Sequence, residues 1–134
     1  VYSSGSAQIK VMQKDGSNRF LLARNVGSDR ADDPVWSPSG MVVVFTGWSS
    51  DLSVPWLMAV QFSLEGAPAV KIPGSDYSIE ANFSPDGFWL VFTSFPDGNR
   101  DIYIITSNGV GKQQLTNDPA MDFDPNWRPP VQTP

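Results

Sequence analysis

The most informative motif in the chain is Asp33-Pro34-Val35-Trp36-Ser37-Pro38-Ser39-Gly40. It recurs as Glu80-Ala81-Asn82-Phe83-Ser84-Pro85-Asp86-Gly87 and, in part, as Asp124-Pro125-Asn126-Trp127-Arg128-Pro129. The aromatic residues of the three copies lie 47 and then 44 residues apart. A period of this length is typical of stacked or radial repeat architectures, in which each repeat is one supersecondary unit.

Other features recur in the same order within each repeat, with small differences in spacing. The segment Val1-Tyr2-Ser3-Ser4 matches Val44-Phe45-Thr46-Gly47 and Val91-Phe92-Thr93-Ser94. A Gly-containing turn recurs as Asp15-Gly16, Glu65-Gly66 and Asn108-Gly109. Since several separate features keep one register, the chain is read as three tandem copies of one repeat.

Each repeat predicts four short strands. The second strands are the β-branched and aromatic runs 42–46 and 89–93, and the Ser-Pro-Asp-Gly type of turn before them is typical of a tight hairpin. Third strands are expected at 9–12, 57–60 and 102–105, and fourth strands at 20–22, 69–72 and 113–115. No segment longer than a turn has helical periodicity.

Four antiparallel strands per repeat predict an all-β fold made of β-propeller blades, because a sheet with two apolar faces must be covered on both sides. We expect a partial blade at 1–32, full blades at 33–79 and 80–123, a closing innermost strand at 124–129 and a Pro-rich linker at 130–134. Propellers close with four to eight blades, so about three repeats indicate part of a larger ring, with six blades as the expected size. The alternative is a three-repeat protomer whose ring is completed by a second copy.

Composition excludes several kinds of chemistry. The 134 residues contain no Cys and no His, so thiol nucleophiles, imidazole bases and the usual zinc ligands are missing. A formal net charge of −5 disfavours nucleic acid and anionic lipid as partners. No apolar run reaches the length of a membrane span, and no cofactor motif is present.

The repeat resembles the WD40-like (PD40) repeat of the TolB-like propeller family. The likeness is strongest over residues 80–116, which contain Asp101-Ile102-Tyr103-Ile104 and Gln114-Leu115-Thr116. It is weaker in the first two copies, where Ser39 replaces the turn Asp. The resemblance implies a periplasmic or extracellular location and a protein-binding role; similar blades also serve as gating domains beside peptidases.

An acidic residue stands three positions before each motif aromatic, namely Asp33, Glu80 and Asp124. Because the first strand of each blade lines the central channel, these carboxylates are predicted to surround one channel mouth and to bind a cation or a basic protein segment. The structural alternative is that each carboxylate accepts backbone N–H groups and fixes the loop that enters its own blade.

Two further groups of residues are weaker candidates. Trp48, Trp56 and Phe95 lie in or beside the loops between second and third strands, where exposed aromatics would contact a partner; burial between blades is the alternative. Asp118, Asp122 and Asp124 would offer oxygens to calcium, but the Gly and terminal Glu of an EF-hand are missing, so no metal site is predicted and a solvated loop is favoured.

These observations favour a non-catalytic binding or scaffold module over an enzyme. Ser37 and Ser84 belong to hairpins, and no His is present to act as their base. The expected partner is a protein or peptide, in addition to the remaining blades of a parent chain or a second copy. The alternative function is an accessory or gating domain of a larger hydrolase or other extracytoplasmic protein.

Overall fold

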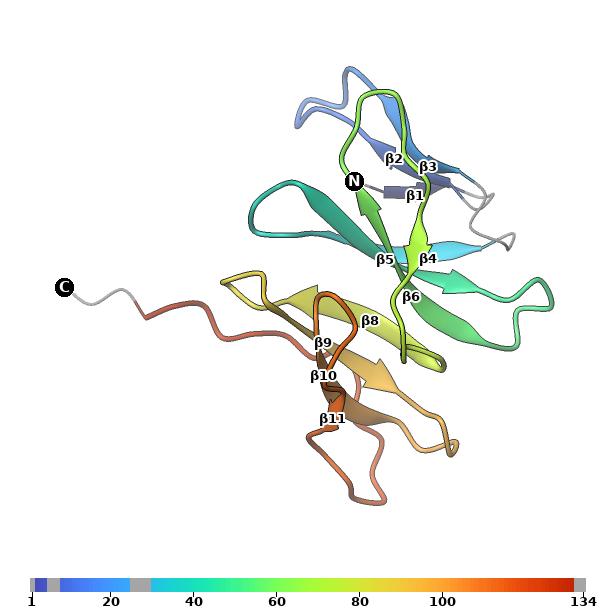
Figure 1. The fold of residues 1–134 in the computed structure, drawn as a ribbon, viewed down its shortest axis with the longest axis vertical. Coiled ribbons are helices and arrows are strands. Elements are labelled where there is room, and N and C mark those ends of the chain that lie inside the picture. The colour runs from blue at the N-terminus through green and yellow to red at the C-terminus, as the bar shows by residue number, and fades with distance from the viewer. Residues whose placement is uncertain (1, 5–7, 25–29, 132–134) are drawn as a thin grey trace.

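The chain folds into three antiparallel β-sheets that lie side by side (Figure 1). A computed structural model describes residues 2–4, 8–24 and 30–131, and no helix occurs within these ranges. The first sheet has three strands, β1 (Tyr2–Ser4), β2 (Gln8–Val11) and β3 (Phe20–Arg24). The second has β4 (Ala31–Trp36), β5 (Val42–Trp48), β6 (Pro55–Gln61) and β7 (Val70–Lys71). The third has β8 (Ser78–Phe83), β9 (Trp89–Ser94), β10 (Asp101–Thr106) and β11 (Gln113–Gln114).

The predicted fold class is confirmed. The chain is all-β, and the second and third sheets contain four antiparallel strands in simple sequence order, as blades of a propeller do. The predicted second, third and fourth strands all occur, with ends that agree or shift by at most two residues. Equivalent positions pair alike, since Phe45 faces Met58 in the second sheet and Phe92 faces Tyr103 in the third.

Side-chain hydroxyls explain why the motif forms a hairpin. The Gly87 N–H donates to the Ser84 carbonyl at 2.8 Å, and Gly87 has φ of +75°, a backbone conformation that favours glycine. The Ser84 Oγ accepts from the Trp89 N–H at 2.9 Å, and the Asp86 carboxylate accepts from the Phe88 N–H at 3.0 Å. The turn therefore carries its own acceptors for N–H groups that would otherwise lack partners.

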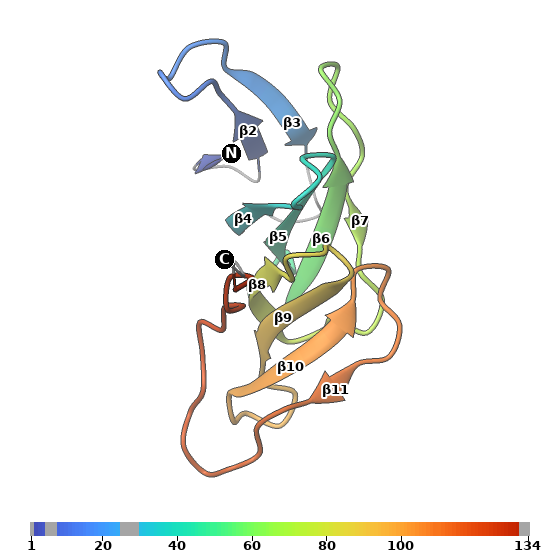
Figure 2. The ribbon, with the colours of Figure 1, turned by 90° about the vertical axis from the view of Figure 1, so that its left-hand side faces the viewer.

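Apolar side chains fill the spaces between neighbouring sheets, which are stacked in Figure 2. One buried cluster joins the first two sheets and includes Ile9, Leu22, Phe45 and Val60. A second cluster joins the second and third sheets and includes Leu57, Ile72, Leu90 and Phe92. Trp36 and Phe83, the motif aromatics, pack against the first and second clusters respectively. Each sheet is therefore stabilised by its neighbour rather than by a core of its own.

The repeated Gly turn touches the preceding sheet. Gly66 has φ of +79°, and a Cβ on it would lie 3.3 Å from the Leu21 carbonyl oxygen. Gly109 has φ of +85°, and a Cβ there would lie 2.7 Å from the Pro73 Cδ. The next residue of the first of these turns, Ala67, donates its N–H to the Leu22 carbonyl at 3.0 Å. Glycine is thus required at this turn both for its backbone conformation and for close contact.

The final part of the chain returns to the third sheet without forming a strand of its own. The Asn82 Nδ2 donates to the Pro125 carbonyl at 3.0 Å, and the Trp127 Nε1 donates to the Asn82 carbonyl at 3.1 Å. These two bonds hold the segment that was predicted as an innermost strand beside β8. The proposed repeat boundaries stay predictions, and residues 1, 5–7, 25–29 and 132–134 of those ranges lie outside the described residues.

Candidate functional site

Two of the three acidic positions, Asp33 and Glu80, lie inside strands, within irregularities of the sheet. The register shifts between Asp32 and Val35 where β4 pairs with β5, and between Ile79 and Asn82 where β8 pairs with β9. Asp33, Glu80 and Asp124 have φ of 51°, 58° and 53°. A left-handed residue in a β-bulge redirects its side chain relative to the regular alternation of a strand. A left-handed backbone thus presents all three carboxylates, within a bulge at Asp33 and Glu80 and outside any strand at Asp124.

Glu80 is bonded to two neighbours. One oxygen, Oε2, accepts the hydroxyl of Thr93 at 3.0 Å and the backbone N–H of Asp124 at 3.2 Å. The Thr93 side chain is completely buried. Glu80 therefore connects the third sheet to the segment that follows it. The structural alternative predicted from the sequence was a carboxylate that accepts backbone N–H groups of its own blade. The N–H that Glu80 accepts belongs instead to the next repeat.

Asp33 and Asp124 differ from Glu80. Neither carboxylate has a hydrogen bond or ion pair to another described residue, and both residues are exposed. The pKa of Asp33 is raised above its ordinary value by burial of the carboxyl group and by the negative charges of Asp32, Glu80 and Asp124, against a smaller opposing effect of Arg30. The structure thus brings the predicted acidic residues together and adds Asp32, which the sequence analysis did not single out.

Two of the three predicted aromatics lie at the same end of the sheets as the acidic residues. Trp48 follows the point where Gly47 pairs with Ala31, and Phe95 follows the point where Ser94 pairs with Ser78. The Trp48 Nε1 donates to the Asp32 carboxylate at 3.0 Å, and the Arg30 guanidinium lies 4.5 Å from the centre of the Trp48 ring. Both aromatics are partly buried.

The corresponding contacts in the third sheet use different residues. The Phe95 ring lies 6.1 Å from the Tyr77 ring and 5.5 Å from the Arg100 guanidinium. Tyr77 stands in the repeat position of Arg30, has φ of 58° and is 38% exposed. Neither Arg30 nor Tyr77 was predicted, but the signal was present, because each stands three residues before an acidic residue of the repeat.

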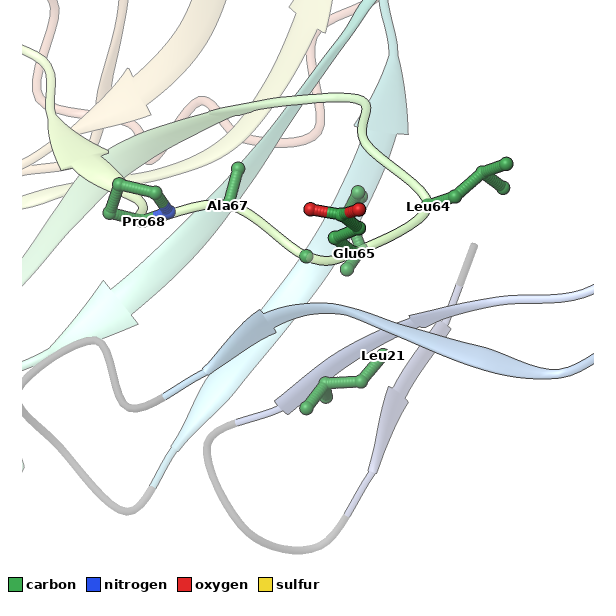
Figure 3. A pocket seen from close by; sticks show the side chains of 7 residues that line it. Leu21, Leu64, Glu65, Ala67 and Pro68 are labelled. Carbon is green, nitrogen blue, oxygen red and sulfur yellow. The ribbon is translucent and has the colours of Figure 1, made fainter.

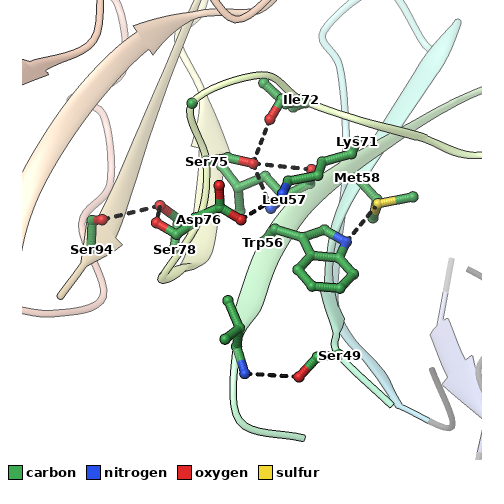
Figure 4. A network of polar contacts seen from close by, with 12 residues as sticks. Ser49, Trp56, Leu57, Met58, Lys71, Ile72, Ser75, Asp76, Ser78 and Ser94 are labelled. Carbon is green, nitrogen blue, oxygen red and sulfur yellow. Dashed lines mark hydrogen bonds and ion pairs between the residues drawn. The ribbon is translucent and has the colours of Figure 1, made fainter. Parts of the chain in front are cut away.

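Trp56 has a different environment, shown in Figure 4. Its ring packs against the cluster between the first two sheets, its Nε1 donates to the Met58 sulfur at 3.0 Å, and Lys71 lies over its ring. In the same view, the buried Ser75 hydroxyl donates to the Ile72 carbonyl at 2.6 Å and accepts from the Leu57 N–H at 3.0 Å. Trp56 is therefore placed by blade packing, the alternative considered for it.

The calcium candidates have local roles. The Asp118 carboxylate accepts the Ala120 N–H at 2.8 Å, as in a turn, and the Asp122 N–H donates to the Arg100 carbonyl at 2.8 Å. Within the described ranges, no three carboxylate, His or Cys side chains are grouped so that they could hold a metal ion. The arrangement thus gives no support for a cation site at these residues.

Ser94 and Lys112 have the side chains of a Ser–Lys catalytic pair, but a substrate cannot reach Ser94. The Lys112 Nζ lies 3.4 Å from the Ser94 Oγ, and burial of the ammonium group lowers the Lys112 pKa. Ser94 is fully buried and also accepts the Ser78 hydroxyl at 3.1 Å, so no substrate reaches it. This contact belongs to the packing of the third sheet against the second, as does the Lys112 bond to the Gly74 carbonyl at 3.1 Å.

The grooves on the surface do not gather charged groups. The groove in Figure 3 lies where the 62–69 hairpin crosses β3, and Glu65 is the one charged side chain that lines it. Leu21, Leu64 and Pro68 form much of its wall. This groove therefore marks the boundary between two packed sheets, and it does not bring catalytic groups together.

The stacked four-stranded sheets, the clusters between them and the repeated acidic position define a segment of a β-propeller. No family model matches the chain. The chain is 29% identical over 125 residues to the Tol-Pal system protein TolB of Anaeromyxobacter sp. (strain K), which covers 92% of the chain and 27% of that protein. A second relative, the Tol-Pal system protein TolB of Anaeromyxobacter dehalogenans (strain 2CP-1 / ATCC BAA-258), is 28% identical over the same shares.

Solved structures give the same fold. TolB from Acinetobacter baumannii superposes with a TM-score of 0.65 at 21% identity, covering 86% of this chain and 28% of that one. A putative TolB from Agrobacterium tumefaciens gives 0.62 at 20% identity, covering 87% and 40%. The chain is thus similar in sequence and in fold to a segment of the TolB β-propeller, and it spans about a quarter of the length of the curated relatives that it matches. No helix of the described residues is long and apolar enough to cross a membrane.

Proposed function

We propose that this chain contributes a non-catalytic, protein-binding face to a TolB-like propeller, and that this face binds a basic segment of a partner protein. The observation that carries the proposal is the pair of exposed carboxylates of Asp33 and Asp124, neither of which forms a hydrogen bond or an ion pair with another described residue. Unfavourable proximity of like charges, as at Asp33, is relieved when a cation binds.

Glu80 supports the site as a positioning residue. Its carboxylate orients the backbone of Asp124 through the 3.2 Å bond and adds negative charge beside Asp33. A Lys or Arg side chain of the partner would then meet the carboxylates of Asp33 and Asp124, with Glu80 behind them. Arg is favoured geometrically because its guanidinium binds carboxylates through paired hydrogen bonds.

The aromatic residues give the face a rim. Trp48 and Phe95 lie beside the acidic residues, each in contact with an arginine of the chain. Aromatic and arginine side chains are enriched at protein interfaces because they offer large contact areas with a polar end. We therefore propose that the partner segment lays its basic side chains on the acidic residues and its flanking apolar residues on the rim.

Binding rather than catalysis also agrees with the relatives. Those that match most of the chain are Tol-Pal system proteins, and we propose that this chain serves in an assembly of that kind. The chain contains no His or Cys, and the Ser94 hydroxyl that lies near Lys112 is buried. A protein or peptide partner is therefore the expected ligand.

The test is calorimetric titration with an arginine-rich model peptide at low and at physiological salt. Asp33→Asn and Asp124→Asn should each weaken binding about three- to ten-fold, because each removes one charge of the site. Glu80→Gln, which keeps an acceptor oxygen, should weaken it less. Glu65→Gln changes net charge equally at the opposite end of the sheets and serves as the matched control.

Two results would contradict the proposal. The first is equal affinity of the wild type and the Asp33→Asn/Asp124→Asn double variant at low salt. The second is an equal loss in Glu65→Gln, which would mean that the peptide responds to net charge alone.

A further inference from the structure

The loop between β5 and β6 carries an apolar side chain on a left-handed backbone. Leu52 has φ of 60° and is 46% exposed. This conformation brings the Cβ of a residue other than glycine close to the following carbonyl oxygen, so it is unfavourable for leucine. Among the described residues, Leu52 is part of neither buried cluster. Burial within the chain therefore does not account for leucine at this position.

The third sheet has glycine at the equivalent position. The Leu52 N–H donates to the Ser49 carbonyl at 2.8 Å, and the Gly98 N–H donates to the Phe95 carbonyl at 3.2 Å. In both loops the aspartate that precedes this position accepts the N–H of the residue that follows it. Gly98 has φ of +93°. The backbone of this turn thus suits glycine, and Leu52 differs by presenting an exposed side chain.

Hydrogen bonds hold the Leu52 loop in one shape. The Ser49 N–H donates to the Val54 carbonyl at 2.8 Å, and the Ser49 hydroxyl oxygen accepts the Val54 N–H at 2.9 Å. The Asp51 carboxylate accepts the Ser53 N–H at 3.1 Å and the Ser53 hydroxyl at 2.7 Å. A side chain on a loop that is already ordered loses less conformational freedom when a partner binds. The loop is therefore suited to presenting Leu52 to another molecule.

Tyr77 is a second large, exposed side chain on a left-handed backbone. Its N–H donates to the carbonyl of Pro55 at 2.7 Å, and Pro55 lies three residues after Leu52. The Tyr77 hydroxyl forms no hydrogen bond with another described residue. In Figure 1 the β5–β6 loop projects from the same end of the sheets as the β9–β10 loop, which begins at Phe95 beside Tyr77. Leu52 and Tyr77 therefore belong to one rim.

This rim continues the acidic face described above. The Leu52 loop begins one residue after Trp48, whose Nε1 donates to Asp32. Asp51 lies next to Leu52, and its hydrogen bonds to Ser49 and Ser53 lower its pKa to about 2, so its carboxylate is ionised at neutral pH. An apolar surface flanked by negative charge is complementary to an apolar residue that has basic neighbours.

We propose that Leu52 and Tyr77 bind one apolar side chain, leucine or an aromatic residue, of the basic partner segment. The inference rests on the proposed function, since it specifies which basic segments the acidic face would select. The apolar side chain would contact Leu52 and the Tyr77 ring, while its basic neighbours meet the acidic residues. Charge then attracts the segment, and the apolar contact discriminates between segments of equal charge.

The first experiment is calorimetric titration with two capped arginine-rich peptides that differ in one central residue, leucine or serine. The wild type should bind the leucine peptide about three- to ten-fold more tightly, because its central side chain buries apolar surface. Leu52→Gly introduces the residue type of the equivalent Gly98. It should remove most of this preference and leave the affinity for the serine peptide unchanged. Its melting temperature should be unchanged or higher, because glycine accepts the left-handed backbone.

Two further variants complete the comparison. Tyr77→Asn removes the ring but keeps a residue that tolerates a left-handed backbone, so it should also reduce the preference for the leucine peptide. Leu64→Ser is the matched control, because Leu64 is 75% exposed and lies beyond the opposite end of β6. This control should keep the full preference.

A second experiment locates the contact by NMR of leucine methyl groups. Titration with the leucine peptide should shift the Leu52 methyl signals and leave those of Leu64 in place. The serine peptide at the same degree of saturation should shift the Leu52 signals much less. Equal shifts with the two peptides would overturn the inference, because the apolar side chain would then bind elsewhere.

The remaining outcomes separate this inference from the proposed function. Equal affinity of the wild type for the two peptides overturns the inference alone, provided that Asp33→Asn and Asp124→Asn still weaken binding. A preference that survives Leu52→Gly, or a loss that comes with a lower melting temperature, also overturns it. If the acidic variants have no effect while the preference depends on Leu52, the proposed function fails and the apolar site stands. If neither peptide binds, both are overturned.

Discussion

The second and third sheets are two copies of one blade, and they differ most at the acidic position. Asp33 and Glu80 share a left-handed backbone and a bulge. The longer side chain of Glu80 reaches Thr93 and the Asp124 N–H, while Asp33, one methylene shorter, has no such bond. One methylene group thus separates a residue that fastens the fold from one that is available to a ligand. A repeated position fixes the backbone, and the side chain decides the role.

The largest expected effect tests whether the two blades are equivalent in packing. Phe45→Ala and Phe92→Ala each remove a fully buried ring from one of the two clusters. Both should lower the free energy of unfolding by about 3–5 kcal/mol. Urea denaturation followed by circular dichroism measures this. A difference of more than about 2 kcal/mol between the two would contradict equivalence, given the usual spread of such substitutions.

The next largest expected change in stability tests whether the extra methylene group of Glu80 accounts for its hydrogen bonds. Glu80→Asp should lower the free energy of unfolding by about 1–3 kcal/mol, because the shorter chain leaves the buried Thr93 hydroxyl without its acceptor. The reciprocal Asp33→Glu should be close to neutral or slightly stabilising, since Thr46 occupies the position of Thr93. Equal destabilisation by both substitutions in urea melts would remove the distinction between the two sites.

A smaller effect concerns the charge of Asp33. Its raised pKa means that the folded state holds the proton more tightly than the unfolded chain, so this residue lowers stability as pH rises above the ordinary value of 3.8. Asp33→Asn should therefore raise the melting temperature at pH 7 by about 2 °C or less, and the gain should vanish below about pH 3.8. Scanning calorimetry at both pH values checks this; a lower melting temperature at pH 7 would contradict it.

The smallest effect lies in the loop between β5 and β6 of the second sheet. The hydroxyls of Ser49 and Ser53 and the Ser53 N–H hydrogen-bond to the Asp51 carboxylate, which lowers its pKa to about 2. The stabilisation is present above the ordinary pKa of 3.8 and is lost as pH falls toward about 2. Carbon-13 NMR should find this pKa, and Ser49→Ala should raise it. An unchanged titration in Ser49→Ala would assign the effect to Ser53 alone.

The fold could be predicted because its determinants are periodic. The Ser-Pro-Asp-Gly turn, the apolar second strands and the Gly of the later turn each have a local physical cause, and repetition located them three times. The clustering of Asp33 with Glu80 and Asp124 followed from the same equivalence, since equivalent positions of neighbouring blades lie close together.

The remainder depended on contacts between residues that have no fixed spacing. The bulges that place Asp33 and Glu80 inside strands, rather than in the loops before them, come from pairing with β5 and β9. The recruitment of Trp56 into packing depends on Met58 and Lys71, neither of which belongs to the repeat pattern. The contact of Phe95 with Tyr77 depends on a left-handed backbone at Tyr77. A Tyr at this position does not predict that conformation, which is typical of Gly, Asn or Asp.

The contact of the Gly turn with the preceding sheet has a consequence for synthesis. The turn at Gly66 contacts β3 and the turn at Gly109 contacts Pro73, which follows β7. Because both supports come earlier in the chain, each is already made when translation from the N-terminus reaches the turn. The order of synthesis therefore matches the order of support along the second and third sheets, so neither turn has to wait for a later part of the chain before it can pack.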